Sequence, residues 1–333
     1  MSKLKNRFLV IGSNSFSGSN FINLLLTKNH KVLGVSRSKE PKSFYLEYKK
    51  NKNIKNFSFV KTNLNKNLNI LINKVKKFKP NIVVNYAAQG MVAESWLNPN
   101  DWYITNIISQ VTLYKKLNEL GLVKKFIHVT TPEVYGSSNK MIKENFNFQP
   151  STPYAISRAT MDLHLYKQFQ NFKLPVIFTR TANVFGPGQQ AYRIVPKFII
   201  SVKKNNKINL HGGGASSRSF IFIDDASKAT YLITKNGKIG NTYHISTNNF
   251  ITIKNLIKKI ASILRVKYKK YVIVSKDRAG KDKAYKLSSK KIRKELGWRP
   301  LTNLEEGINK TIKWAEKNIK LINQSELKYK HKN

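Results

Sequence analysis

Cysteine is absent from the 333 residues, and long apolar runs are missing as well. Without cysteine the chain has no disulfide, no thiolate zinc site and no thiol nucleophile, which fits a reducing compartment such as the cytoplasm. The first apolar stretch, residues 8–11, is too short for a signal-peptide core and turns at once into polar residues. No apolar run approaches the roughly 18 residues of a membrane span, so no transmembrane helix is predicted.

Acidic residues are also scarce, because only 17 Asp and Glu oppose 61 Lys and Arg, for a formal charge of +44. Such an excess raises nucleic acid as a partner. The lysines, however, are spread over nearly every segment together with many Asn and Ile, and no zinc finger, RNP signature or aromatic-basic platform accompanies them. We expect a basic surface that attracts anionic substrates, with no specific nucleic-acid partner and no membrane partner.

What the sequence does contain is a regular alternation of apolar strands and amphipathic helices. The hydrophobic content of 41% is enough for a sizeable core in one large domain or two unequal ones. Strands are predicted at residues 8–11, 32–35, 57–61, 82–85 and 125–129, and helices at residues 20–28, 68–78 and 101–120. The alternation predicts an α/β fold of the Rossmann type, with a doubly wound parallel sheet and a ligand at the carboxyl ends of its strands.

The chain changes character after residue 182, where the segments become more irregular. We predict a dinucleotide-binding domain at residues 1–182, a helix at 222–235 that returns to it, a smaller α/β substrate lobe at 183–325 and a solvated basic tail at 326–333. Apolar spacing predicts helices at residues 252–264 and 304–318 within the substrate lobe.

A glycine turn, Gly12 to Gly18, joins the first strand to the first helix, as a dinucleotide-binding turn requires. Gly12 permits the tight turn and Gly18 lets the helix pack closely on the strand, whereas Ser15 occupies the middle position and is expected to crowd the pyrophosphate. The second strand is followed by Arg37, which suits a 2′-phosphate better than the usual acidic residue does. This favours NADP over NAD and leaves both open, and an exposed surface Arg37 is the alternative.

Tyr154 and Arg158 lie four residues apart in a predicted helix and therefore on one face of it. A cation within about 4–6 Å favours the phenolate and lowers its pKa by roughly 1–3 units. Such a phenol could take a proton from an alcohol while a hydride leaves for a cofactor. By itself the pair equally fits a half-buried Tyr154 beside a solvated Arg158, so neighbouring motifs decide.

Several motifs occur in order between residues 7 and 317. They are Gly12-(x5)-Gly18, Asn85-x-Ala87-Ala88, Thr130-Thr131-x-Glu133-Val134-Tyr135-Gly136, Pro153-Tyr154-x-x-x-Arg158, Arg180-Thr181-Ala182-Asn183, Arg218-Ser219-Phe220, Asp277-Arg278-x-Gly280-x-Asp282-x-x-Tyr285 and Leu296-Gly297-Trp298. Together they resemble the extended short-chain dehydrogenase/reductase family of nucleotide-sugar enzymes, and the last two are similar to dTDP-glucose 4,6-dehydratases in particular.

The resemblance implies a set of catalytic roles. Thr131 would hydrogen-bond the sugar 4-hydroxyl, Tyr154 would be the base for its oxidation, and Arg158 stands where the family has a Lys that holds the nicotinamide ribose. Glu133 would then remove the C5 proton. Water would leave from C6 and the hydride would return there, so that NAD or NADP is not consumed.

The resemblance also implies binding residues. Cofactor contacts would come from Gly12, Ser15, Phe16, Gly18, Arg37, Asn63, Leu64, Ala87, Ala88, Asn106, Tyr154 and Arg158. Substrate contacts would come from Gln89, Asn183, Arg193, Arg218, Asn249 and Arg278. Ordinary packing is the alternative for Ala87, Ala88 and Asn106, and a surface position is the alternative for the arginines. No metal is predicted, because none of the six His pairs with carboxylates at metal spacing. A homodimer through the helices after Asp101 and Tyr154 is implied by the resemblance alone.

Three positions depart from the family pattern: Arg158 replaces the Lys, Asn63 replaces an Asp near the adenine, and Pro132 replaces an Asp that protonates the departing C6 hydroxyl. Proline has no proton to donate, so Glu133 or a bound water would supply it. A nucleotide-sugar 4,6-dehydratase serving polysaccharide synthesis is the leading interpretation. A 4-epimerase, a UDP-glucuronate decarboxylase and an inactive cofactor-binding scaffold are the alternatives.

Overall fold

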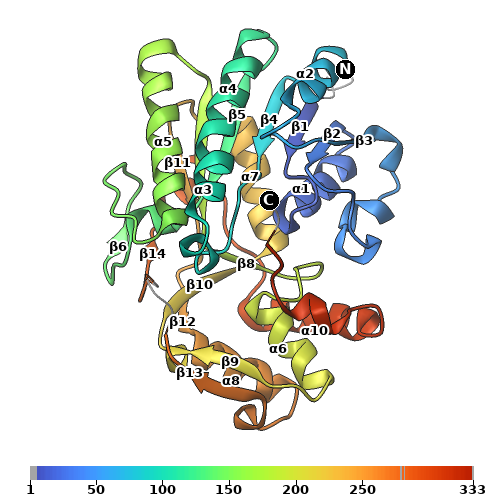
Figure 1. Cartoon of the computed structure of the whole chain (residues 1–333), viewed down its shortest axis with the longest axis vertical. Helices are drawn as coiled ribbons and strands as arrows, with labels where there is room; N and C mark the ends of the chain where they lie inside the picture. The colour runs from blue at the N-terminus through green and yellow to red at the C-terminus, as the bar shows by residue number, and fades with distance from the viewer. Residues whose placement is uncertain (1–5, 278–279, 281, 332–333) are drawn as a thin grey trace.

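A parallel sheet organises the larger part of the chain (Figure 1). The computed structural model describes residues 6–277, 280 and 282–331. In it seven strands lie in the order β3-β2-β1-β4-β5-β7-β11, and every neighbouring pair is parallel. The strands are β1 (Arg7–Ile11), β2 (Lys31–Ser36), β3 (Phe57–Lys61), β4 (Ile82–Asn85), β5 (Lys125–Thr130), β7 (Val176–Thr181) and β11 (Thr242–Ile245). The predicted Rossmann-type parallel sheet is confirmed.

Helices cover both faces of this sheet, which is why its strands read as short continuous apolar runs. One face carries α1 (Phe16–Thr27) and α7 (Ile223–Asn236), and the other carries α2 (Leu68–Phe78), α4 (Ser109–Glu119) and α5 (Pro153–Phe172). Successive side chains of β1 alternate between the two resulting cores, with Phe8 and Val10 in one and Leu9 and Ile11 in the other.

The return of the chain to the sheet is longer than the predicted 222–235. Strand β11 pairs with β7 at the sheet edge, with His244 opposite Arg180, so residues 242–245 belong with the first domain. Helix α9 (Lys290–Leu296) contributes Ile292 to the same core as α7. The assignment of residues 183–325 to the substrate lobe was wrong for these elements, because a four-residue strand and a two-turn helix carry little periodic signal.

A second lobe with its own apolar core stands at the carboxyl ends of the strands (Figure 1). Its elements are β8 (Asn183–Phe185), α6 (Ile194–Lys203), β9 (Ile208–His211), β10 (Ser217–Phe222), β12 (Phe250–Thr252), α8 (Ile253–Ile263), β13 (Val272–Ser275) and α10 (Leu304–Asn318). A further short pair, β6 (Met141–Ile142) and β14 (Lys286–Leu287), lies beside the first domain. Among the described residues, no helix combines the length and apolarity that crossing a bilayer requires.

The helix predicted at residues 101–120 is interrupted. The structure shows α3 (Pro99–Tyr103), a π-helical turn (Ile104–Ile108) and then α4. Within this turn Asn106 is fully buried, and its Nδ2 donates to the backbone oxygen of Gln89 (3.0 Å) and to Ser157 Oγ (2.9 Å). Widened helical turns of this kind are frequent near functional sites.

A buried ion pair fixes α5 against the sheet. Arg180 Nη2 on β7 lies 3.0 Å from Asp162 Oδ2 on α5, and His128 Nε2 on β5 lies 3.4 Å from Asp162 Oδ1. The side chains of Asp162 and Arg180 are inaccessible to solvent. Burial alone would raise the pKa of Asp162, but Arg180 and His128 outweigh it and hold this pKa below its ordinary value. Asp162 is therefore an anion that compensates buried cations.

Replacing Asp162 by Ala is expected to lower the free energy of unfolding by about 3–5 kcal/mol, because Arg180 is left buried without its counter-ion. Urea denaturation measures the loss. Since the folded-state pKa of Asp162 is depressed, its contribution is present above the ordinary value of 3.8 and is lost as the pH falls below it. Glu306→Ala, which removes an exposed i,i+4 pair with Lys310, is the control and should cost no more than about 0.5 kcal/mol. Equal losses in the two variants would contradict this account.

Candidate active site

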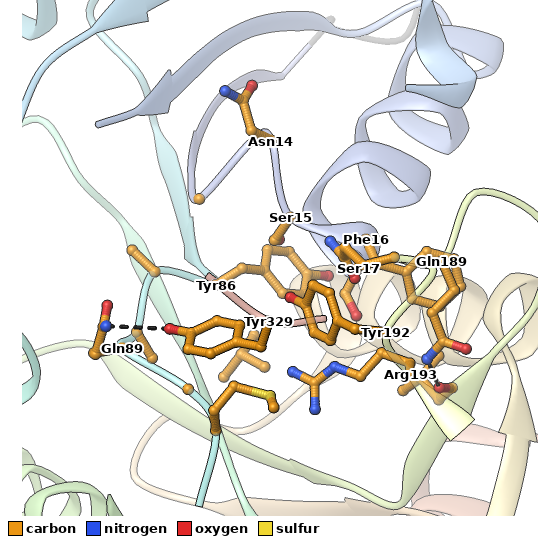
Figure 2. Close-up of a pocket in the computed structure, with 18 of the residues that line it drawn as sticks. Asn14, Ser15, Phe16, Ser17, Tyr86, Gln89, Gln189, Tyr192, Arg193 and Tyr329 are labelled. Carbon is orange, nitrogen blue, oxygen red and sulfur yellow. Dashed lines mark hydrogen bonds between the residues drawn. The ribbon is translucent and has the colours of Figure 1, made fainter. Parts of the chain in front are cut away.

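A cavity of about 1130 Å³ opens where the carboxyl ends of the strands face the second lobe (Figure 2). It exceeds the roughly 300–1,000 Å³ of a single small-ligand pocket, so a dinucleotide and a second ligand have room together. The predicted site residues that line it are Gly12, Ser15, Phe16, Arg37, Asn63, Leu64, Ala87, Ala88, Gln89, Thr131, Glu133, Tyr154, Arg158, Asn183 and Arg193.

The glycine turn brings the start of α1 to the cavity. Gly12 has φ +83°, and a Cβ there would lie 2.8 Å from the backbone nitrogen of Ala87. A Cβ on Gly18 would lie 2.3 Å from the carbonyl oxygen of Gly12, so neither position tolerates a side chain. Ser15 caps α1, and its Oγ accepts from the Gly18 N–H (3.0 Å). The hydroxyl is thus turned into the helix end, and the start of α1 lies at the cavity, where a helix N-terminus suits a phosphate.

Arg158 supplies donors at the floor of the cavity. Its side chain is only 1% exposed, and its Nη2 donates to the carbonyl oxygen of Val129 and lies 3.4 Å from His128 Nε2. Its Nε and Nη1 find no acceptor among the described residues. Buried donors are costly to leave without partners, so an incoming ligand with hydroxyl oxygens would satisfy them. This arrangement fits the ribose contact that the sequence implied.

Thr131 and Glu133 are held by a short 3₁₀ turn, Pro132–Tyr135, that follows β5. Thr131 caps the turn by accepting from the Glu133 N–H (3.3 Å), and Pro132 stands at the first position, where its missing N–H costs nothing. Glu133, Tyr154 and Arg193 also line an adjoining recess of about 180 Å³. The carboxyl and phenol groups predicted to act on one ligand therefore share one small chamber.

The pKa of Tyr154 differs from the expectation. Burial raises the pKa of this phenol and the charge of Glu133 raises it further, while Arg158 and a hydrogen bond with Thr131 lower it without prevailing. The prediction of a lowered pKa for Tyr154 was wrong for the ligand-free protein, because spacing reveals the cation but neither the burial nor the nearby carboxylate. Burial likewise raises the pKa of Glu133, against the opposing charges of Arg218 and Arg193.

Tyr285 also lines the cavity. It belongs to the motif that begins at Asp277, but no role was predicted for it. Its hydroxyl donates to Asn183 Oδ1 (2.8 Å) and lies 3.5 Å from Glu133 Oε1. Burial raises the pKa of Tyr285 well above its ordinary value, and Glu133 adds to this. The phenol is thus neutral beside the carboxylate, and its single proton is directed at Asn183. Its place in the motif with Asp277 was the available signal, whereas the predicted Arg278 lies outside the described residues.

Of the predicted site residues that the structure describes, four do not line the cavity. Gly18 lies within the turn, and Asn106 lies behind the wall, where it holds the backbone of Gln89. Arg218 packs over the ring of Tyr285 and donates to the carbonyl oxygens of Ser217, Asp282 and Lys283. Asn249 is exposed beside Thr247. Asn106 and Arg218 thus hold neighbouring backbone, whereas Asn249 lies at the surface.

Arg37 and the end of the chain meet at Gln89. Arg37 Nη2 donates to Gln89 Oε1 (2.9 Å), and Gln89 Nε2 lies 3.3 Å from the hydroxyl of Tyr329 and 2.9 Å from Nδ1 of His331. The prediction that residues 326–333 form a solvated tail was wrong for the described part, because residues 326–331 lie along the cavity. A run of alternating Lys and aromatic residues gave no indication of this long-range packing.

Comparison with known proteins gives a consistent picture. The model of the GDP-mannose 4,6 dehydratase family matches residues 9–311. The dTDP-D-glucose 4,6-dehydratase of Homo sapiens is 34% identical over 247 residues, covering 72% of this chain and 70% of the human one. The dTDP-glucose 4,6-dehydratase of Haemophilus influenzae is 31% identical over 268 residues, which cover 74% of this chain and 79% of the Haemophilus enzyme.

Solved structures agree. The dTDP-glucose 4,6-dehydratase of Streptomyces venezuelae with NAD and TYD bound superposes with a TM-score of 0.87 at 27% identity, covering 95% of this chain and 98% of that one. The UDP-glucose 4-epimerase of Thermotoga maritima with UDP-glucose has a TM-score of 0.84 at 26% identity, covering 94% and 99%. The fold is thus shared by enzymes of both reaction types.

Substituting Glu133 by Gln is expected to lower the pKa of Tyr154, because the carboxylate that disfavours the phenolate is removed. Tyrosine labelled with ¹³C at Cζ reports the titration by NMR, and a Tyr154→Phe sample assigns the signal. Glu305→Gln removes an exposed carboxylate paired with Lys259 and should leave the signal of Tyr154 unchanged. A rise or no change in the Glu133→Gln protein would show that the two groups do not face one another.

Proposed function

This chain belongs to the GDP-mannose 4,6-dehydratase family of extended short-chain dehydrogenase/reductases, and from that membership we propose that it dehydrates a nucleotide-diphosphate sugar across C5 and C6. A dTDP-sugar is the first substrate to test, because dTDP-glucose 4,6-dehydratases are among the relatives of similar sequence and structure. The observation that carries the proposal is the shared recess of Glu133 and Tyr154 beside the unpartnered donors of Arg158.

Thr131 and Tyr154 act on the sugar 4-hydroxyl. Thr131 positions this hydroxyl, and Tyr154 accepts its proton as the C4 hydrogen leaves as hydride. A bound nicotinamide supplies the hydride acceptor and returns the same hydride later. The guanidinium of Arg158 stabilises the phenolate that forms, because it opposes the burial and the Glu133 charge that otherwise raise the pKa of Tyr154.

Glu133 acts on the neighbouring carbons. A ketone at C4 acidifies the C5 proton, which the Glu133 carboxylate accepts. The protonated Glu133 then gives this proton to the C6 hydroxyl, which leaves as water. The hydride held by a bound nicotinamide would return to C6 and a proton from solvent would reach C5, while Tyr154 would release to solvent the proton it took from the 4-hydroxyl. The product is the 4-keto-6-deoxy sugar. A raised pKa suits a carboxyl group that must both take and give a proton, and this offsets the missing donor at Pro132.

Among the alternatives, a 4-epimerase receives support from the structural likeness to the Thermotoga maritima enzyme. Epimerisation uses Thr131 and Tyr154 but has no task for Glu133. A UDP-glucuronate decarboxylase would use the same carboxylate, and an inactive scaffold would use none of the three. Glu133 is half-buried, its pKa is raised and it lines the recess, and these features favour dehydration.

The proposed cofactor is NAD, as in structural relatives, with NADP as the alternative that Arg37 favours. The donor set fits either dinucleotide, because Gly12, the start of α1 and Arg158 line one cavity. Direct binding measurements with both dinucleotides separate them. The lack of cysteine fits a reducing compartment, and the cytoplasm is the proposed location.

Incubation with dTDP-glucose, UDP-glucose, GDP-mannose and UDP-glucuronate is expected to yield a 4-keto-6-deoxy sugar, detected by its alkali-induced absorbance, from one of the nucleotide hexoses. Tyr154→Phe should lower kcat by about 10²–10⁴-fold, because the base is lost. Glu133→Gln should lower the rate of elimination by a similar factor. Epimerised sugar without the chromophore, at a rate unchanged in Glu133→Gln, would replace dehydration by epimerisation. A protein that binds a dinucleotide but converts none of the four nucleotide sugars would favour the inactive scaffold.

We also propose a homodimer formed through α4, α5 and the π-helical turn between α3 and α4. These elements lie side by side (Figure 1), and four apolar residues on them are between 40% and 62% exposed. These residues are Ile104, Ile108, Ile156 and Leu163. Exposed apolar side chains gathered on one surface are typical of an interface between protein chains.

Sedimentation analysis is expected to give a dimer that Ile108→Lys converts to a monomer, because a charge would then be buried in the apolar interface. Leu301→Lys changes another exposed apolar residue, 74% accessible, and should leave the dimer intact. A wild-type monomer, or a dimer insensitive to Ile108→Lys, would rule out this interface.

A further inference from the structure

The end of the described chain, residues 323–331, crosses the cavity from the second lobe to the first domain, and we call it the C-terminal strap. In Figure 1 it is the dark red segment that rises from α10 toward the sheet. It begins with a 3₁₀ turn, Gln324–Leu327. The strap residues that line the cavity are Ser325, Glu326, Lys328, Tyr329 and Lys330.

The near end of the strap is fastened beside the loop after β2. Glu326 pairs with Lys42 (2.7 Å) and accepts a hydrogen bond from the hydroxyl of Tyr45 (2.6 Å). Leu327 is 5% exposed and belongs to the core of the second lobe, and Lys204 donates to the carbonyl oxygen of Ile322 just before the strap. These contacts tie the segment to both lobes.

The far end is seated on α3 of the first domain. Nε2 of His331 lies 2.7 Å from Asp101 Oδ2, and its ring stacks on Trp102 with centroids 5.0 Å apart and an interplanar angle of 10°. Trp102 is fully buried, so the platform beneath His331 is rigid. His331 Nδ1 also lies 2.9 Å from Nε2 of Gln89, in the wall of the cavity.

Between its two ends the strap faces the cavity with Tyr329. In Figure 2 this ring lies beside Tyr192, with Ser15 and Phe16 of the glycine turn on the other side of the space. The rings of Tyr329 and Tyr192 meet edge to face at 5.5 Å. Lys328 and Lys330, which flank Tyr329, are exposed and also line the cavity. The strap therefore brings one aromatic ring and two cations to the space where a dinucleotide would pass.

We propose that the C-terminal strap is a wall of the dinucleotide site that retains the cofactor, with Tyr329 as its apolar surface and Lys328 and Lys330 attracting the diphosphate. The inference rests on the proposed function, because a cofactor that regains its hydride within one turnover has no need to leave. Slow release of the cofactor then does not limit turnover. A segment that covers the cofactor site and is held at both ends slows this release. Affinity differences of this kind act mainly through the dissociation rate.

The test measures cofactor release from the full chain. Reduced dinucleotide, NADH or NADPH according to which one the wild type binds, is displaced by excess oxidised dinucleotide in a stopped-flow instrument. Energy transfer from the protein's tryptophans to the bound reduced nicotinamide reports the release. Tyr329→Ala and His331→Ala are each expected to accelerate release by about tenfold or more, because the wall or its anchor is lost.

A charge-matched pair of double variants isolates the lysines. Lys328→Ala with Lys330→Ala should accelerate release and make it less dependent on salt. Lys317→Ala with Lys320→Ala removes two exposed lysines of the same C-terminal region that do not line the cavity, and release should stay at the wild-type rate. Hydrogen exchange of residues 324–331 should slow when dinucleotide binds.

Release at the wild-type rate in Tyr329→Ala and His331→Ala would overturn the proposal. Faster and tighter binding in these variants, or faster exchange of residues 324–331 with dinucleotide bound, would also overturn it, since the strap would then obstruct the site. A wild type that binds neither dinucleotide would refute the proposed function and this inference together. Binding without any effect of the strap would refute the inference alone.

Discussion

The geometry of the site depends on one buried carboxylate. Asp162, Arg158 and Tyr154 lie on successive turns of α5, and Asp162 meets Arg180 on β7 and His128 on β5. Rotating or sliding α5 would separate these charges inside the protein, where an uncompensated charge is costly. The ion pair therefore fixes the register of the helix, and with it the position of the Tyr154 phenol opposite Thr131.

The same burial sets the chemistry of the recess. It raises the pKa of both Glu133 and Tyr154. Arg218 and Arg193 oppose the increase at Glu133, and Arg158 and Thr131 oppose it at Tyr154. Tyr285 places a neutral phenol beside Glu133. A carboxyl group whose pKa is raised is better suited to serve two proton transfers in sequence.

The sequence predicted those features that depend on local patterns. The first five strands and the amphipathic helix Leu304–Asn318 followed from periodicity. The family resemblance implied that Thr131, Glu133, Tyr154 and Arg158 share one site, and all four line one cavity. Features that depend on distant contacts were missed. The short strand β11 is defined by its pairing with β7, the shifted pKa of Tyr154 by its burial, and the strap by a platform at Trp102 more than 200 residues away.

The strap also separates the retention of the cofactor from the chemistry of the reacting groups. It lies beyond residues 9–311, the part that the family model matches, whereas the proposed acid, base and ribose-binding groups all lie inside it. Mutations in the final ten or so codons can then tune how long the coenzyme resides on the protein without altering the reacting groups.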